Sequence, residues 1–80
     1  MDALKNCQNK VVGTKQVLRG LKAGTIRRVY VANDSDTFLF QRVLGAAEAA
    51  QVPVVRIATM KELGQACGVD VSAAAAGITE

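Results

Sequence analysis

The sequence predicts an α/β fold, a three-layer α/β/α sandwich around a mixed sheet. Runs of β-branched residues alternate with helical patterns along the chain, and the segments between them are rich in residues that cap helices and turn the chain. With 80 residues, the chain has room for one domain, which we place over residues 1–80. Half of the residues are apolar, and many of these are Ala and Val, so we expect a core of small, closely packed side chains.

A short strand over residues 10–12 is expected before a helix over residues 14–23. Three apolar residues of this helix share one face: Val17, Leu18 and Leu21. Three cations share another face: Lys15, Arg19 and Lys22. Either Gly13 or Thr14 is the expected N-cap, and Gly24 is expected to end the helix in a left-handed conformation. The segment is therefore predicted to be an amphipathic helix with a basic face.

A buried strand, a longer helix and a second strand follow. Residues 28–32 have the sequence Arg-Val-Tyr-Val-Ala, and this continuous apolar run predicts a strand covered on both faces. Residues 33–36, Asn-Asp-Ser-Asp, are turn and cap residues, and they lead into a helix expected over residues 37–50. Pro53 then breaks the chain before a strand expected over residues 54–58.

A short helix and a last strand complete the expected fold. Thr59 and Glu62 have the spacing of a capping box, so a helix is expected over residues 60–67, ending at Gly68. The small, apolar residues that follow predict a loop and then a strand over residues 72–76.

The charges are distributed unevenly along the chain. Residues 3–33 carry no carboxylate but seven cations: Lys5, Lys10, Lys15, Arg19, Lys22, Arg27 and Arg28. Residues 34–80 carry three cations and six carboxylates, so the formal net charge of +3 averages a positive half and a mildly negative half. Clustered Lys and Arg gain free energy by releasing counterions from phosphates, which makes nucleic acid the leading candidate partner. The alternative is a solvated face that keeps the domain soluble.

Composition disfavours several classes of function. The chain has no histidine, and no two carboxylates have the spacing of a catalytic dyad, so we expect no enzyme and no catalytic residues. Cys7 and Cys67 lie far apart without a C-x-x-C spacing, so we expect no metal site, no cofactor and two reduced thiols. No secretory signal and no apolar run of about 20 residues is present, which predicts a soluble cytoplasmic protein without a membrane partner. Scarce aromatic residues disfavour a base-stacking platform.

Gly13-Thr14-Lys15-Gln16 stands at the expected start of the basic helix. The N–H groups and the dipole of a helix N-terminus favour a phosphate. Lys and Gln side chains can both hydrogen-bond the edges of purine bases. The alternative is that Thr14 only caps the helix while Lys15 and Gln16 lie in water.

Several motifs occur along the chain in a set order: Gly13-Thr14-Lys15-Gln16-Val17 with Arg19 and Gly24, Val31-Ala32-Asn33-Asp34, Val52-Pro53-Val54, and Leu63-Gly64-Gln65-Ala66-Cys67-Gly68-Val69. This ordered set resembles the L-seven-Ae family of kink-turn RNA-binding ribosomal proteins, in particular its small bacterial members of the YbxF type. The resemblance implies a three-layer α/β/α sandwich with a mixed four-stranded sheet. It also implies a kink-turn as ligand, which is a duplex bent sharply at a short bulge and followed by tandem sheared G·A pairs.

The resemblance further implies which residues bind RNA. The family's Gly-Thr-Asn-Glu turn enters the groove at the G·A pairs and matches residues 13–16, where Lys15 and Gln16 depart from the pattern. Arg19 matches a basic residue one turn later, Asp36 an acidic position near the bulge, and residues 69–72 an apolar loop that packs on unstacked bulge nucleotides. From the residues alone, Val69 and Val71 suit entry into a core strand. The expected RNA-binding residues are Gly13, Thr14, Lys15, Gln16, Arg19, Lys22, Asp36, Val69, Asp70 and Val71.

We therefore expect a monomeric RNA-binding protein that recognises and stabilises kink-turn RNA, in ribosomal RNA or in a riboswitch. The alternative is a protein-interaction or ribosome-assembly module that uses its basic face for an acidic protein partner.

Overall fold

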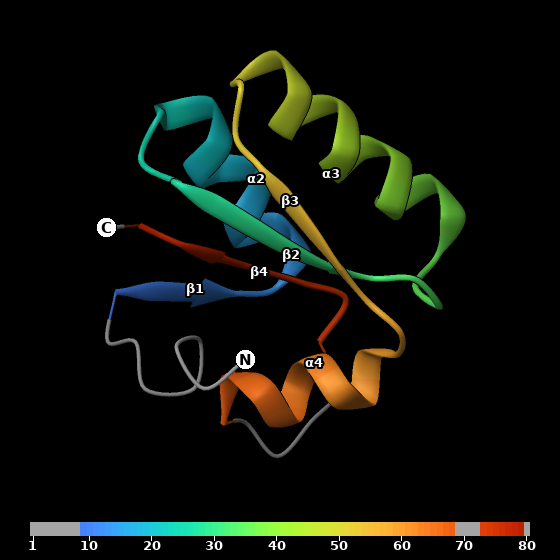
Figure 1. The fold of residues 1–80 in the computed structure, drawn as a ribbon. Coiled ribbons are helices and arrows are strands. Elements are labelled where there is room, and N and C mark those ends of the chain that lie inside the picture. The colour runs from blue at the N-terminus through green and yellow to red at the C-terminus, as the bar shows by residue number, and fades with distance from the viewer. Residues whose placement is uncertain (1–8, 69–72, 80) are drawn as a thin grey trace.

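Strands and helices alternate along the chain as the sequence predicts. The computed structural model describes residues 9–68 and 73–79. Its elements in order are β1 (Lys10–Val12), α2 (Thr14–Ala23), β2 (Arg28–Ala32), α3 (Thr37–Ala49), β3 (Val54–Ile57), α4 (Met60–Cys67) and β4 (Ala75–Ile78). Figure 1 shows α2 and α3 on one face of the sheet and α4 on the other, so the predicted three-layer sandwich is confirmed.

The sheet has four strands in the order β1-β4-β2-β3. β2 and β3 run parallel, whereas β4 runs antiparallel to both β1 and β2, so the sheet is mixed as expected. β1, β2 and β3 therefore point in one direction, and each leads into a helix. As a result, the N-termini of α2, α3 and α4 gather where these strands end and β4 begins (Figure 1). We call this the carboxyl end of the sheet, and the opposite one the amino end.

The core lies on both faces of the sheet, and β2 contributes to both. Val29 and Val31 point to one side and Tyr30 and Ala32 to the other, which confirms that this strand is covered on both faces. The side chains packed between the sheet and the layer of α2 and α3 are Val17, Leu21, Ile26, Val29, Val31, Val43, Ala47 and Ala75. The side chains packed between the sheet and α4 are Tyr30, Ala32, Ile57, Leu63, Ala66, Cys67, Ala73 and Ala76.

Most boundaries agree with the sequence. α2, β2 and α4 have the predicted bounds, and Gly24 and Gly68 end their helices in the left-handed conformation, with φ 76° and 78°. α3 and β3 each end one residue earlier than predicted. In the described part of the chain, no helix has the length and apolar character to cross a membrane.

The predicted last strand is present, but its predicted bounds of residues 72–76 are wrong, because β4 spans Ala75–Ile78 and continues through Gly77. Glycine is depleted in strands because it has no side chain to pack. Here the side chain of the buried Ile26 fills the space above Gly77. A Cβ at Gly77 would lie 3.0 Å from Ile26 Cδ1, so the strand continues where the sequence indicates an end. Ser72 lies outside the described residues.

Candidate nucleic-acid interface

A single residue, Gly13, connects β1 to α2. Its dihedral angles are φ 115° and ψ 142°, a conformation that is open to glycine and strained for residues with a Cβ. The Gly13 N–H donates to the carbonyl oxygen of Ala75 (2.9 Å), and the Gly13 carbonyl accepts from the Val17 N–H (3.0 Å). These bonds fix the start of α2 against the start of β4. Of the two expected N-caps, Gly13 is the one that the structure assigns.

The N-terminus of α2 has no side-chain cap, unlike those of α3 and α4. Gly13 has no side chain to accept a hydrogen bond, and the first turn of α2 holds no acidic residue. At α3, the Asp36 carboxylate accepts from two N–H groups, and at α4 the Thr59 hydroxyl accepts from the Glu62 N–H. Because the first N–H groups of a helix have no intrahelical acceptor, the start of α2 offers donors and a positive dipole end to an anion.

Lys15 and Gln16 are exposed in the first turn of α2, and Thr14 is half-buried. The Gln16 side chain folds back over the turn, because its Oε1 lies 2.7 Å from the place that a Cβ of Gly13 would take. The structure therefore brings Gly13, Thr14, Lys15 and Gln16 together at the carboxyl end of the sheet, with the Gln16 amide bordering the turn.

The basic face of α2 is confirmed. Val17 and Leu21 are buried against the sheet, and the cations on the other faces of the helix are exposed: Lys15, Arg19 and Lys22. The cations of the N-terminal half do not all share this surface. In the sheet, Lys10 and Arg28 both pair with Ile78 at the amino end, where Arg27 also lies. The positive charge is therefore divided between α2 and the opposite end of the sheet.

Long-range hydrogen bonds join the loops around the start of α2. Asp34 Oδ1 accepts from the Met60 N–H at 2.7 Å, which ties the β2–α3 connection to the start of α4. The Asn33 N–H donates to the carbonyl oxygen of Ile57 (2.7 Å), and the Ala73 N–H donates to that of Met60 (3.1 Å). These hydrogen bonds hold together the loops at the carboxyl end of the sheet, which is the end where α2 begins.

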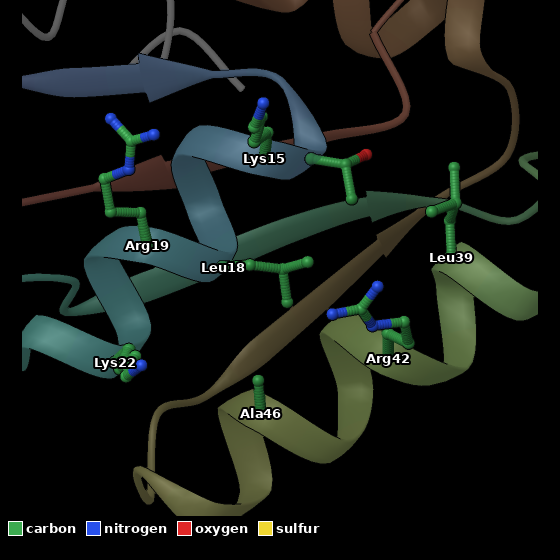
Figure 2. Close-up of a pocket in the computed structure, with 8 residues that line it drawn as sticks. Lys15, Leu18, Arg19, Lys22, Leu39, Arg42 and Ala46 are labelled. Atoms are coloured by element: carbon green, nitrogen blue, oxygen red, sulfur yellow. The ribbon is translucent and has the colours of Figure 1, made fainter.

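A groove of about 770 Å³ runs between α2 and α3 (Figure 2). Its lining comes from both helices: Thr14, Lys15, Leu18, Arg19, Lys22, Leu39, Arg42 and Ala46. Figure 2 shows Leu18 and Arg42 projecting into the space between the helices, whereas Lys15 and Arg19 project from α2 away from α3. The lining contains cations and no carboxylate, so the groove extends the positive surface of α2 onto α3.

Arg42 is a residue that sequence analysis missed. The signal was weak but present, because Leu39, Arg42 and Ala46 recur at helical spacing on one face of α3. Assigning that face to a groove required knowing that α2 and α3 cover the same side of the sheet.

The sequence of residues 2–80 matches the family model of the ribosomal protein L7Ae/L30e/S12e/Gadd45 family. The chain belongs to this family. An RNA-binding protein of Geobacillus thermodenitrificans is 46% identical over 68 residues, which cover 85% of this chain and 83% of that protein. The RNA-binding protein YbxF of Geobacillus stearothermophilus is 47% identical with the same coverage.

Among solved structures, the Giardia lamblia 15.5kD RNA binding protein is similar to this member of the L7Ae/L30e/S12e/Gadd45 family. It has a TM-score of 0.89 at 28% sequence identity, and the match covers 99% of this chain and 67% of that chain. The predicted family and fold are therefore confirmed. The prediction that the chain is not an enzyme is also confirmed by the family and by relatives that are named as RNA-binding proteins.

The other predicted site residues of this family member are Asp36, Val69, Asp70 and Val71. Asp36 Oδ1 accepts from the N–H groups of Phe38 (2.9 Å) and Leu39 (3.2 Å), so its carboxylate caps α3 at the carboxyl end. Its contact with RNA stays a prediction. Val69, Asp70 and Val71 lie outside the described residues, and the chain re-enters the described part at Ala73, beside Met60.

Of the two cysteines, the structure describes Cys67. Cys67 is free and buried, and burial raises the pKa of its thiol above the ordinary value of 9.0, against a smaller opposing effect of the Lys10 charge. Cys7 lies outside the described residues. Within residues 9–68 and 73–79, no group of three or more His, Cys, Asp or Glu side chains is placed to hold a metal ion.

Proposed function

We propose that this protein binds structured RNA, and that within this class it recognises kink-turns and stabilises their bent conformation. Family membership and the names of relatives up to 48% identical support RNA as the partner. The observation that carries the proposal is the uncapped N-terminus of α2, where the Gly13 turn, Lys15, Gln16 and the cations of the basic face meet.

The start of α2 acts on both the phosphates and the bases of the RNA. The uncapped N–H groups and the positive dipole end bind a phosphate without a side-chain charge. Lys15 and Gln16 hydrogen-bond purine edges in the groove of the G·A pairs, since Lys donates to guanine O6 and N7 and the Gln amide both donates and accepts. Arg19 and Lys22 add charge-assisted contacts to the backbone of the RNA.

The other predicted residues complete the interface. Thr14 contributes to the turn beside Gly13, and Asp36 approaches the bulge while it caps α3. We propose that Val69, Asp70 and Val71 contact the unstacked bulge nucleotides. Together these contacts favour the kinked form over the extended form, so the protein shifts the population of the RNA towards the bend. We propose that residues 1–80 act as a single domain and that one copy binds each kink-turn.

A mobility-shift titration of this protein with a kink-turn RNA and with an unkinked duplex of equal length tests the proposal. We expect clear preference for the kink-turn. Arg19→Ala should weaken kink-turn binding by about 1–3 kcal/mol, because an exposed helical cation that contacts RNA is lost while the helix tolerates Ala. Arg27→Ala is the matched control, since Arg27 is an exposed cation at the amino end of the sheet.

Two outcomes would contradict the proposal. Equal affinity for the kink-turn and the duplex would exclude kink-turn recognition and leave only non-specific attraction to phosphates. An absence of RNA binding, together with capture of an acidic protein through Arg19, would favour the protein-interaction module instead.

A further inference from the structure

The groove between α2 and α3 extends the proposed RNA-binding surface beyond the residues that a kink-turn is expected to contact. Thr14 and Lys15 line one end of the groove and also belong to the first turn of α2, so the groove opens at the carboxyl end of the sheet. Lys22 and Ala46 lie further along it. An RNA held at the first turn of α2 therefore has the open groove next to it.

Arg42 lines the α3 side of the groove, and Phe38, which is not among the lining residues, contacts Arg42; together they suit unpaired nucleotides. Arg42 projects into the groove (Figure 2). Its guanidinium carbon lies 5.8 Å from the centre of the Phe38 ring. Phe38 is 66% exposed, which is unusual for an aromatic side chain of a small domain. A guanidinium binds a phosphate, and an exposed ring beside a cation offers a stacking face to a base.

The charge and the shape of the groove favour a nucleic-acid strand as the occupant. The lining has no carboxylate, Arg42 projects into the groove, and Lys15 and Arg19 project from α2 on the side away from α3. Positive charge therefore lies both in the groove and beside it, which favours a polyanion. The small apolar floor of Leu18, Leu39 and Ala46 can contact a sugar or a base without leaving a buried polar group unpaired.

We propose that the α2–α3 groove binds a single-stranded segment that flanks the kinked RNA, with Arg42 on a phosphate and Phe38 stacking on an unpaired base. This rests on the proposed function, because the kink-turn at the start of α2 presents the flanking strand to the groove. The groove thereby selects among kink-turns according to whether a single strand flanks them.

The test compares a minimal kink-turn RNA with the same RNA carrying a single-stranded extension of about six nucleotides, which is within the usual site size of a small single-strand binding domain. Extensions at the 5′ end and at the 3′ end of each strand form separate arms of the experiment. With the unmodified protein, we expect one of these extensions to lower the Kd about tenfold, the size of one charge-assisted contact.

Arg42→Gln removes the charge and keeps most of the side-chain volume. We expect this variant to lose the gain from the extension while its Kd for the minimal kink-turn changes less than about twofold. Arg56→Gln is the matched control. Arg56 is an exposed cation 5.4 Å from the centre of the Phe40 ring, but it lies on β3 outside the groove lining, so the gain should persist. Phe38→Ala should reduce the gain in part.

The proposal fails if no extension improves binding by the unmodified protein, or if Arg42→Gln weakens the minimal and the extended RNA equally. It also fails if the groove instead takes an acidic amphipathic peptide in an Arg42-dependent manner, which would make it a protein-docking site. Failure of the proposed function gives a different result, namely equal affinity for the minimal kink-turn and the unkinked duplex. Thermal unfolding of each variant confirms that it is folded.

Discussion

Replacement of Gly13 by alanine tests whether the turn before α2 is both a structural requirement and part of the RNA interface. The backbone of Gly13 lies at φ 115° and ψ 142°, where a residue with a Cβ is strained by about 1–3 kcal/mol. The new Cβ would also lie 2.7 Å from Gln16 Oε1, but that atom is at the far end of an exposed, flexible side chain and can move. Backbone strain therefore dominates the loss of stability.

We expect Gly13→Ala to lower the free energy of unfolding by about 1–3 kcal/mol, and a domain of this size loses about 4–8 °C in Tm per kcal/mol. A stability of about 5–15 kcal/mol would keep the variant folded at room temperature. Binding should weaken as well, by about tenfold or more, because the Cβ displaces the Gln16 amide and the strain shifts the first-turn N–H groups that bind phosphate. Thermal unfolding and a kink-turn titration below the Tm measure the two effects.

Gly24→Ala is the matched control. Gly24 also has a positive φ, 76°, but a Cβ there would meet no atom within 4 Å, and the residue ends α2 far from the turn. This variant should lose about 1–2 kcal/mol of stability and keep its affinity for RNA. If Gly13→Ala binds a kink-turn as well as Gly24→Ala does when both are folded, the turn lies outside the interface. Unchanged stability of Gly13→Ala would contradict the strained backbone.

Three further predictions concern stability. Asp36→Ala should lose about 1 kcal/mol in chemical denaturation, because it removes the N-cap of α3, and an unchanged midpoint would contradict that role. Gly45→Ala should raise the free energy of unfolding by about 0.5–1 kcal/mol, because a Cβ there meets open space within a helix. Gly20→Ala should lower it by about 1–3 kcal/mol, because its Cβ would lie 2.7 Å from the buried Ile26. Similar effects of the two substitutions would refute this contrast. Burial raises the pKa of the Cys67 thiol above 9.0, so its contribution to stability is complete below about pH 9 and is lost as the pH rises through the folded value. The stability of the unmodified protein should therefore fall more steeply above pH 9 than that of Cys67→Ala, and parallel pH profiles would contradict the shift.

Elements with strong local signals could be predicted from the sequence. The apolar stripe and the terminal Gly24 define α2, and the spacing of Thr59 and Glu62 defines the start of α4, because each signal lies within one or two turns of the element. β4 could not be placed in this way. Its continuation through Gly77 depends on Ile26, which lies about fifty positions earlier and packs over the strand only in the folded sheet.

The candidate site was likewise predictable where its signals are local and not where they join distant elements. Residues 13–16 and the exposed cations of α2 follow from local pattern and family resemblance, and the structure brings them together. Arg42 lies on α3, so its place beside α2 could not be derived from local spacing. The same holds for the hydrogen bond of Asp34 with Met60, which is 26 positions away. The count of cations along the sequence does not show which of them share a surface. Arg28 belongs to the same cationic stretch as Arg19 but lies at the other end of the sheet.

The one-residue connection between β1 and α2 explains why this helix N-terminus, among the helices of the described residues, is available to an anion. α3 and α4 begin with residues whose side chains, Asp36 and Thr59, satisfy first-turn N–H groups. An N-cap of that kind adopts an extended backbone with negative φ, as Thr59 does at −136°. The connection before α2 requires φ 115°, which favours glycine and so excludes a capping side chain. The conformation that turns the chain in one residue therefore also leaves the donors of α2 unsatisfied, and a phosphate is the partner that its charge and its neighbouring cations favour.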